Sequence, residues 1–101
     1  MTYGVIYSEL IRSFRSKDTQ AVFEGRFSRK FHGIADSAEK KLIQIHAAVQ
    51  LADLTKFPGN RLEALKGDRL GQHSIRINDQ YRICFVWKDG DAYNVEIVDY
   101  H

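Results

Sequence analysis

The sequence of 101 residues contains a single cysteine, Cys84, and a single proline, Pro58. One cysteine excludes an intramolecular disulfide, so the disulfide-bonded scaffold of small secreted domains is not available to this chain. No apolar run approaches the roughly 20 residues that span a bilayer. The first residues also lack the charged and apolar regions of a signal peptide. These absences favour a cytoplasmic protein with no membrane partner.

The sequence also has little net charge and no metal-binding motif. Fifteen Lys and Arg against thirteen Asp and Glu give a formal net charge of +2, which alone is weak support for nucleic-acid binding. No Gly-rich phosphate loop, Gly-x-Ser-x-Gly motif or His-x-x-x-His pair occurs. The sequence therefore predicts neither a metal site nor a cofactor, and its four histidines are scattered: His32, His46, His73 and His101.

What the chain does contain is enough for one packed domain. Hydrophobic residues make up 44% of it and aromatic residues 12%, a composition that argues against disorder. The length suits one domain and is too short for two. We assign residues 10–101 to this domain and residues 1–9 to an N-terminal extension.

The pattern before Pro58 is mainly helical. Residues 10–14 are a strand candidate, and Asp18 can cap a short helix that Gly25 ends. A longer helix follows, with Asp36 and Glu39 at the spacing of a capping box. Its apolar positions fall on one stripe at helical spacing: Ala38, Leu42, Ile45, Val49 and Ala52. We interpret His46, in the same helix, as an ordinary boundary histidine.

The pattern after the turn at residues 57–60 is that of strands. Strand candidates cover residues 61–65, 73–78, 81–87 and 92–98, and Asp79-Gln80 and Asp89-Gly90 are the hairpin turns. The last strand is expected to carry Tyr93, Val95 and Ile97 on one side. The sequence thus predicts an α+β fold, with N-terminal helices packed on one face of a small, mainly antiparallel sheet. The other face of the sheet would remain open for a ligand.

Arg82 is difficult to explain by its local sequence. It lies within an apolar strand, and a two-residue turn would place it opposite Ile77. A buried guanidinium is costly unless it meets an anion or lies at the rim of the sheet. One interpretation is an internal salt bridge to Asp99 or Glu63, and the other is a phosphate-binding site.

The C-terminus is the second unusual feature. The last strand runs directly into Asp99, Tyr100 and His101, where terminal residues are more often a frayed polar tail. A carboxylate, a phenol and an imidazole accept and donate protons, and histidine titrates near neutral pH. The tail is therefore either frayed or part of a catalytic site.

Basic residues gather in two regions. One has no Asp or Glu and holds Arg26, Arg29, Lys30 and His32. The other is the C-terminal half, with Arg61, Lys66, Arg69, Arg76, Arg82 and Lys88. Each of these side chains could simply be solvated, whereas phosphate binding needs several of them to converge.

Three motifs in this order resemble the HigB branch of the RelE superfamily of toxins. They are residues 60–69 (NRLEALKGDR), residues 71–83 (GQHSIRINDQYRI) and the closing residues 98–101 (VDYH). Residues 11–14 (IRSF) are also similar to the usual opening of these proteins. The resemblance covers roughly residues 10–101.

This resemblance implies the toxin of a type II toxin–antitoxin pair, a ribosome-dependent endoribonuclease acting on messenger RNA. Its partner would be a helix-turn-helix antitoxin of the HigA type. The functional residues that it implies are Lys66, Arg82, Asp99, Tyr100 and His101. Some members have a histidine where this chain has Glu63, so either Glu63 takes that proton-handling role or the role is absent. Further candidates for RNA binding are Arg61, Arg69, His73 and Arg76.

Metal-independent RNA cleavage would suit these residue types. The ribose 2′-OH attacks the adjacent phosphorus and leaves a cyclic phosphate. Lys66 and Arg82 could stabilise the developing charge, His101 and Asp99 could transfer protons, and Tyr100 could stack on a base.

Two alternatives remain open. The chain could share the fold but act on another target such as DNA gyrase, as ParE toxins do, although such proteins would not need the Asp-Tyr-His end. It could also be a non-catalytic binding module, an alternative that the Glu63 substitution keeps open.

Overall fold

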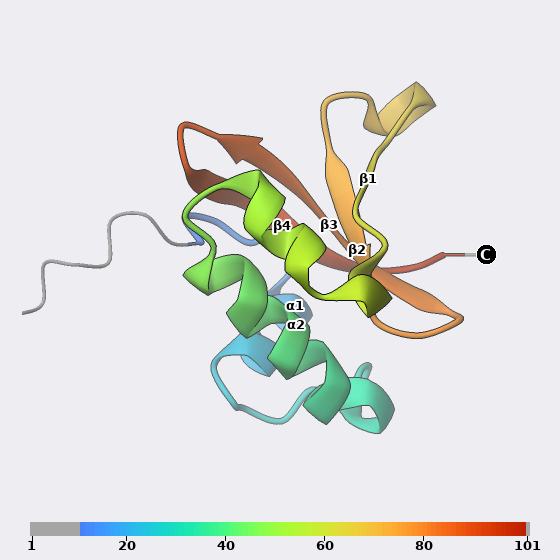
Figure 1. The fold of residues 1–101 in the computed structure, drawn as a ribbon. Coiled ribbons are helices and arrows are strands. Elements are labelled where there is room, and N and C mark those ends of the chain that lie inside the picture. The colour runs from blue at the N-terminus through green and yellow to red at the C-terminus, as the bar shows by residue number, and fades with distance from the viewer. Residues whose placement is uncertain (1–10, 101) are drawn as a thin grey trace, which may run out of the picture.

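The structure is a computed structural model that describes residues 11–100. The predicted extension, residues 1–9, and His101 therefore lie outside the described residues. Two α-helices and four short 3₁₀ helices (η) accompany four strands (Figure 1). In chain order these are α1 (Lys17–Phe23), η2 (His32–Ile34), α2 (Ala35–Ala47), η3 (Leu51–Lys56), η4 (Pro58–Asn60), β1 (Glu63–Ala64), η5 (Gly67–Arg69), β2 (His73–Arg76), β3 (Tyr81–Lys88) and β4 (Asp91–Asp99).

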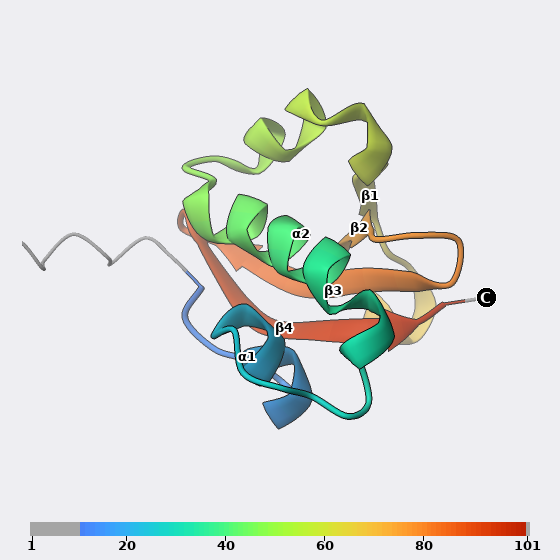
Figure 2. The ribbon, with the colours of Figure 1, turned by 90° about the horizontal axis from the view of Figure 1, so that it is seen from below.

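The four strands form one antiparallel sheet in the order β1-β2-β3-β4. Residues 11–15 run parallel to β4 along its outer edge, where Arg12 N donates to Ala92 O at 2.7 Å and Arg15 N donates to Val95 O at 2.9 Å. The strand predicted at residues 10–14 is thus reduced to isolated bridges at Ile11 and Phe14. Figure 2 shows α2 lying over β3 and β4, with α1 beside β4. The predicted α+β architecture is confirmed.

The core lies between the helices and one face of the sheet. The helices contribute Val22, Leu42 and Ile45, and the sheet contributes Ile83 and Phe85, all of them buried. Since burial of one such side chain stabilises a fold by about 1.5–3 kcal/mol, this face is fixed as the inner one. The opposite face carries Ser74, Arg82, Cys84 and Glu96, which are related by the cross-strand pairing.

Two of the predicted helix starts are wrong. Ser16, not Asp18, caps α1, because its Oγ accepts a hydrogen bond from Thr19 N at 3.1 Å. Asp18 lies in the first turn, where its Oδ1 accepts from Ser28 Oγ at 3.1 Å. At α2 no side chain caps the start, because the helix continues directly from η2 and needs no separate cap.

The long helix also ends earlier than its apolar stripe predicts. Ala48 has an extended backbone after Ala47, and the side chain of Val49 is 72% exposed. A new turn begins at Gln50, whose side chain and that of Asp53 form a capping box for η3. The backbone N–H groups of Gln50 and Val49 donate to Asp53, and they hold the pKa of this carboxyl below its usual value.

Turn geometry changes two predictions about the strands. The β2–β3 turn is closed by Ile77 N, which donates to Tyr81 O at 2.9 Å, and holds the three residues 78–80 rather than two. Arg82 therefore pairs with Arg76 and not with Ile77. In β4, Asn94 has a left-handed backbone (φ 53°) and forms an irregularity that places Tyr93 opposite Val86. Tyr93 is therefore on the outer face, and the predicted alternation is wrong at this residue.

A buried amide, Asn60, joins the turn after η3 to α2. Its Oδ1 accepts from Lys41 Nζ at 2.6 Å, and its Nδ2 donates to Gln44 Oε1 at 2.9 Å and to Leu54 O at 3.1 Å. Burial, with a smaller effect from the charge of Arg76, lowers the pKa of Lys41. This amide therefore satisfies three polar groups in a region where water has little access.

Asn60→Ala is expected to lower the free energy of unfolding by about 2–3 kcal/mol. The substitution removes three hydrogen bonds and leaves buried groups unpaired, for which the desolvation cost is about 1–3 kcal/mol each. Urea unfolding followed by circular dichroism measures the change. A loss below about 0.5 kcal/mol, the level of an ordinary surface substitution, would contradict this role.

Candidate functional site

Arg82 lies on the outer face of the sheet and is the centre of a compact group of side chains. It is only 8% exposed. Its Nε donates to Ser74 Oγ at 2.8 Å, and its Nη2 donates to Arg61 O at 2.8 Å and to Ser74 O at 3.4 Å. We call Arg82, Ser74, Glu63, Tyr100 and the carbonyl of Arg61 the Arg82 cluster. The neighbouring strand β2 and one loop carbonyl thus fix the plane of the guanidinium.

The anion beside Arg82 is Glu63, whose Oε1 is 3.3 Å from Nη2. Of the two carboxylates named as possible partners from the sequence, the structure selects this one because Glu63 pairs with Ser74 and so lies on the same face as Arg82. The side chain of Glu63 is 50% exposed. The guanidinium is therefore held by neutral oxygens inside the protein and neutralised by an anion at its surface.

The tail is ordered through Tyr100. Tyr100 N donates to Gln80 O at 2.6 Å, and Gln80 Nε2 donates to Asp99 Oδ2 at 3.1 Å. The Arg82 Cζ atom lies 5.5 Å from the centre of the Tyr100 ring, in a cation–π contact. The structure thus brings Tyr100 into the Arg82 cluster and attaches Asp99 to the neighbouring turn, and a frayed tail is excluded for these two residues.

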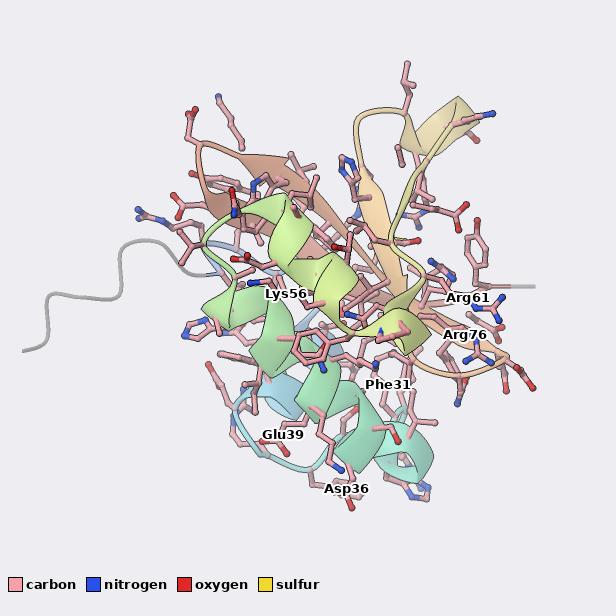
Figure 3. All side chains as sticks on the ribbon, viewed as in Figure 1. Phe31, Asp36, Glu39, Lys56, Arg61 and Arg76 are labelled. Atoms are coloured by element: carbon pink, nitrogen blue, oxygen red, sulfur yellow. The ribbon has the colours of Figure 1, made fainter. Side chains whose placement is uncertain are left out.

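Two other predicted residues lie close to the cluster. Arg76 pairs with Arg82 across β2 and β3, and the carbonyl of Arg61 accepts from Arg82; Figure 3 labels both arginines. Arg76 forms an ion pair with Asp79 in the β2–β3 turn. The Arg61 side chain is exposed, while its left-handed backbone (φ 45°) is followed by the short strand β1. Arg61 thus adds positive charge at the edge of the cluster, whereas the charge of Arg76 is balanced by Asp79.

The remaining predicted residues lie elsewhere. Lys66 is exposed at the start of η5. It follows β1, whereas Arg61 precedes that strand. His73 pairs with Phe85 and stacks on its ring at 6.3 Å, so it lies on the inner face. Within the described residues, the structure brings neither of them into contact with Arg82.

A hollow of about 300 Å³ opens on the outer face beside the cluster. We call it the Arg69 hollow, and its lining residues are Arg15, Asp68, Arg69, Gln72 and Glu96. Cys84 is paired with Glu96 across β3 and β4 and is fully buried. Burial raises the pKa of its thiol, so a reactive thiolate is disfavoured there.

Sequence reasoning missed four residues of this face: Ser74, Arg15, Gln72 and Glu96. The prediction of a strand at residues 73–78 gave no reason to pair Ser74 with Arg82. The other three come from the start of the chain, a loop and the last strand. Only the parallel pairing of residues 11–15 with β4 brings Arg15 near Glu96, at 3.9 Å.

Two general features bear on the class of protein. None of the helices formed by residues 11–100 is long and apolar enough to cross a membrane. Over the same residues, no group of three or more His, Cys, Asp or Glu side chains converges as metal ligands would.

Comparison with known proteins shows similarity to one family of toxins. A family model for the RelE-like toxin HigB of type II toxin–antitoxin systems matches residues 12–101. The "Endoribonuclease HigB" of Proteus vulgaris is 34% identical over 93 residues, covering 91% of this chain and all of that protein. The "Toxin HigB-1" of Vibrio cholerae is 46% identical over 61 residues, covering 60% of this chain and 64% of that protein. A structure of the YoeB-YefM complex from Staphylococcus aureus aligns at a TM-score of 0.48 and 17% identity, covering 90% of this chain and 97% of that one.

The match to the family model extends over most of the chain and includes every residue of the Arg82 cluster and of the Arg69 hollow. The chain belongs to the HigB-like family, the RelE-like toxins of type II toxin–antitoxin systems.

Proposed function

We propose that this toxin is an endoribonuclease that cuts messenger RNA on the ribosome and so inhibits translation. The name of the Proteus vulgaris relative, which the chain matches over that protein's whole length, supports ribonuclease activity. The observation that carries the proposal is the Arg82 cluster. It presents an oriented cation and an aromatic ring on the free face of the sheet, next to a tail of proton-transferring residues.

The proposed reaction needs no metal ion. The ribose 2′-OH attacks the adjacent phosphorus, the bond to the 5′ oxygen of the next nucleotide breaks, and a cyclic phosphate remains on the first. Arg82 stabilises the negative charge that develops on the phosphoryl oxygens. His101 donates a proton to the leaving oxygen. Tyr100, 39% exposed beside the guanidinium, stacks on a base.

In this mechanism Glu63 accepts the proton of the 2′-OH. Its carboxylate lies 3.3 Å from Arg82 Nη2 and is half exposed, so a phosphate held by Arg82 would lie next to it. Because this carboxylate is half exposed, it can turn towards solvent when a phosphate takes its place beside the guanidinium. Asp99 orients the tail through Gln80.

The proposed roles of Lys66, Arg61, Arg69, His73 and Arg76 concern RNA binding. Lys66 has a long exposed side chain at the start of η5, and we assign it to a phosphate further along the message. Arg61 and Arg76 would contact phosphates beside the cut. For His73, which is stacked on Phe85, the geometry supports a packing role better than a contact with RNA.

As a member of a type II toxin–antitoxin family the protein has an antitoxin partner, and we propose a helix-turn-helix protein of the HigA type. The ribosome and its messenger RNA are the other proposed partners. We assign the toxin domain to residues 10–101, with residues 1–9 outside it.

Inducible expression followed by mapping of RNA 5′ ends tests the function directly. Expression is expected to stop growth within one generation and to produce cuts inside translated codons, and co-expression of the antitoxin from the neighbouring gene should restore growth. A ribosome stalled by an antibiotic before induction is the control. Cuts that occur equally in untranslated RNA would contradict ribosome dependence. Growth arrest with DNA damage and no cuts would indicate a gyrase-directed toxin, and the absence of both effects a binding module.

A further inference from the structure

The Arg69 hollow has the size and the chemical groups of a small ligand site. Its volume of about 300 Å³ is at the lower end of the range for small-molecule pockets. Arg69 Nη1 donates to Gln72 Oε1 at 3.0 Å and to Glu96 Oε1 at 3.3 Å. These contacts hold a guanidinium, an amide and a carboxylate together at one place on the outer face.

The charges of the hollow indicate what it does not bind. Arg15 and Arg69 are balanced by Asp68 and Glu96, so an isolated phosphate gains little there, and carboxylates at the rim repel it. A divalent cation would be repelled by the two guanidinium groups. The hollow therefore suits a neutral ligand that carries both hydrogen-bond donors and acceptors.

Open donors and acceptors remain in the hollow. Both ion pairs of Glu96 use Oε1, and Oε2 has no hydrogen-bond partner among residues 11–100. The same holds for Gln72 Nε2, and Arg69 uses only Nη1 in its contacts with the described part of the chain. A guanidinium edge offers paired donors and a carboxylate offers paired acceptors.

We propose that the Arg69 hollow binds a guanine base of single-stranded RNA. Guanine carries an adjacent pair of acceptors, O6 and N7, and an adjacent pair of donors, N1–H and the N2 amino group. Arginine is the usual partner of the first pair, and Glu96 would accept from the second. Single-stranded RNA is commonly read on these edges. This inference rests on the proposed ribonuclease function and gives it a base preference.

The position of the hollow relates this base to the cut. Glu96 pairs with Cys84, and two positions further along the same strands Val98 pairs with Arg82. Two strand positions correspond to about 7 Å, and both sites open on the outer face. A base in the hollow would therefore belong to a nucleotide next to the phosphate held by Arg82.

The test is an NMR titration of the labelled protein with each nucleoside 5′-monophosphate and, separately, with inorganic phosphate. Guanosine monophosphate is expected to shift the signals of Gln72 and Glu96 and to bind about tenfold more tightly than the adenosine, cytidine and uridine compounds. Inosine monophosphate, which lacks the N2 amino group, should lose most of this preference. Glu96→Gln should reduce the preference about tenfold without unfolding the protein.

Glu24→Gln is the matched control, because Glu24 is also paired with an arginine, at 2.7 Å from Arg26, but lies at the end of α1. It should leave the preference for guanine unchanged. Equal binding of all four nucleotides, or shifts that inorganic phosphate reproduces, would overturn the proposal. If messages were cut but Glu96→Gln changed no base preference of the cleavage, the guanine proposal would be overturned while the ribonuclease function remained. If the protein bound guanine but cut no RNA, the proposed ribonuclease function would be contradicted and the proposed guanine site would stand.

Discussion

Arg82→Ala is expected to slow message cleavage by about 10²- to 10³-fold, which is the usual loss when one group that stabilises developing charge is removed. Growth arrest should disappear with it. The loss is large because three oxygens fix the direction of this guanidinium, so a neighbouring exposed arginine cannot replace it. Single-turnover cleavage of a defined message on programmed ribosomes measures the rate.

The effect on folding is expected to be smaller. Glu63, the only carboxylate that Arg82 contacts among residues 11–100, is half exposed and can return to water when the guanidinium is gone. Arg82→Lys separates charge from geometry, because an ammonium group keeps the charge but cannot donate to Ser74 and Arg61 in the same plane. We expect it to recover only part of the rate.

Arg26→Ala is the matched control for this prediction. Arg26 is also paired with a glutamate, Glu24, but is exposed and lies after α1, away from the outer face. It should keep full toxicity. Cleavage by Arg82→Ala within a factor of about three of the unmodified protein, with both proteins folded by circular dichroism, would remove Arg82 from the proposed mechanism.

The parts of the fold that local chemistry determines could be predicted from the sequence. Asp89-Gly90 forms the β3–β4 turn, with both residues at positive φ (50° and 83°), because this pair favours such a hairpin whatever surrounds it. The central strand around Ile83 was evident from its apolar side chains. The helical positions of Leu42 and Ile45 also followed from their spacing, and both are buried.

Features that depend on packing could not be predicted in the same way. One additional residue in the β2–β3 turn changed the partner of Arg82, since each shift of register moves a side chain to another neighbour. The irregularity at Asn94 moved Tyr93 to the outer face for a similar reason. The early end of α2 depends on Gln50 and Asp53 capping a new turn, which no apolar pattern shows.

The candidate site likewise combines contacts that the sequence could indicate with contacts that depend on packing. The ion pair of Arg82 with Glu63 is one of the two interpretations that the sequence allowed, because alternation in short strands decides which face these residues share. The contact of Arg82 with Tyr100 was not predicted. Lys66 and His73 are as close to them in the sequence but lie elsewhere, one in a loop and the other on the inner face. The Arg69 hollow joins segments from three regions of the chain, so its residues carried no common signal.

His101→Ala is expected to reduce cleavage by about 10²- to 10⁴-fold, the usual contribution of one proton-transfer group. His101 lies outside the described residues, so the prediction rests on the tail that precedes it. Tyr100 and Asp99 are hydrogen-bonded to Gln80, and the ring of Tyr100 lies against Arg82. An imidazole titrates near pH 6.5, so it can donate a proton to the leaving oxygen at neutral pH.

The pH profile distinguishes this role from a structural one. As the general acid, His101 acts in its protonated form, so cleavage by the unmodified protein should fall as the pH rises through the pKa of the imidazole. His101→Ala should lose that dependence together with the rate. His32→Ala, which removes an exposed histidine stacked on Phe27 at 6.1 Å, should change neither. If His101→Ala kept both the rate and the profile, proton transfer would have to be assigned to another residue of the tail, and Asp99→Asn would then be the variant that abolishes cleavage.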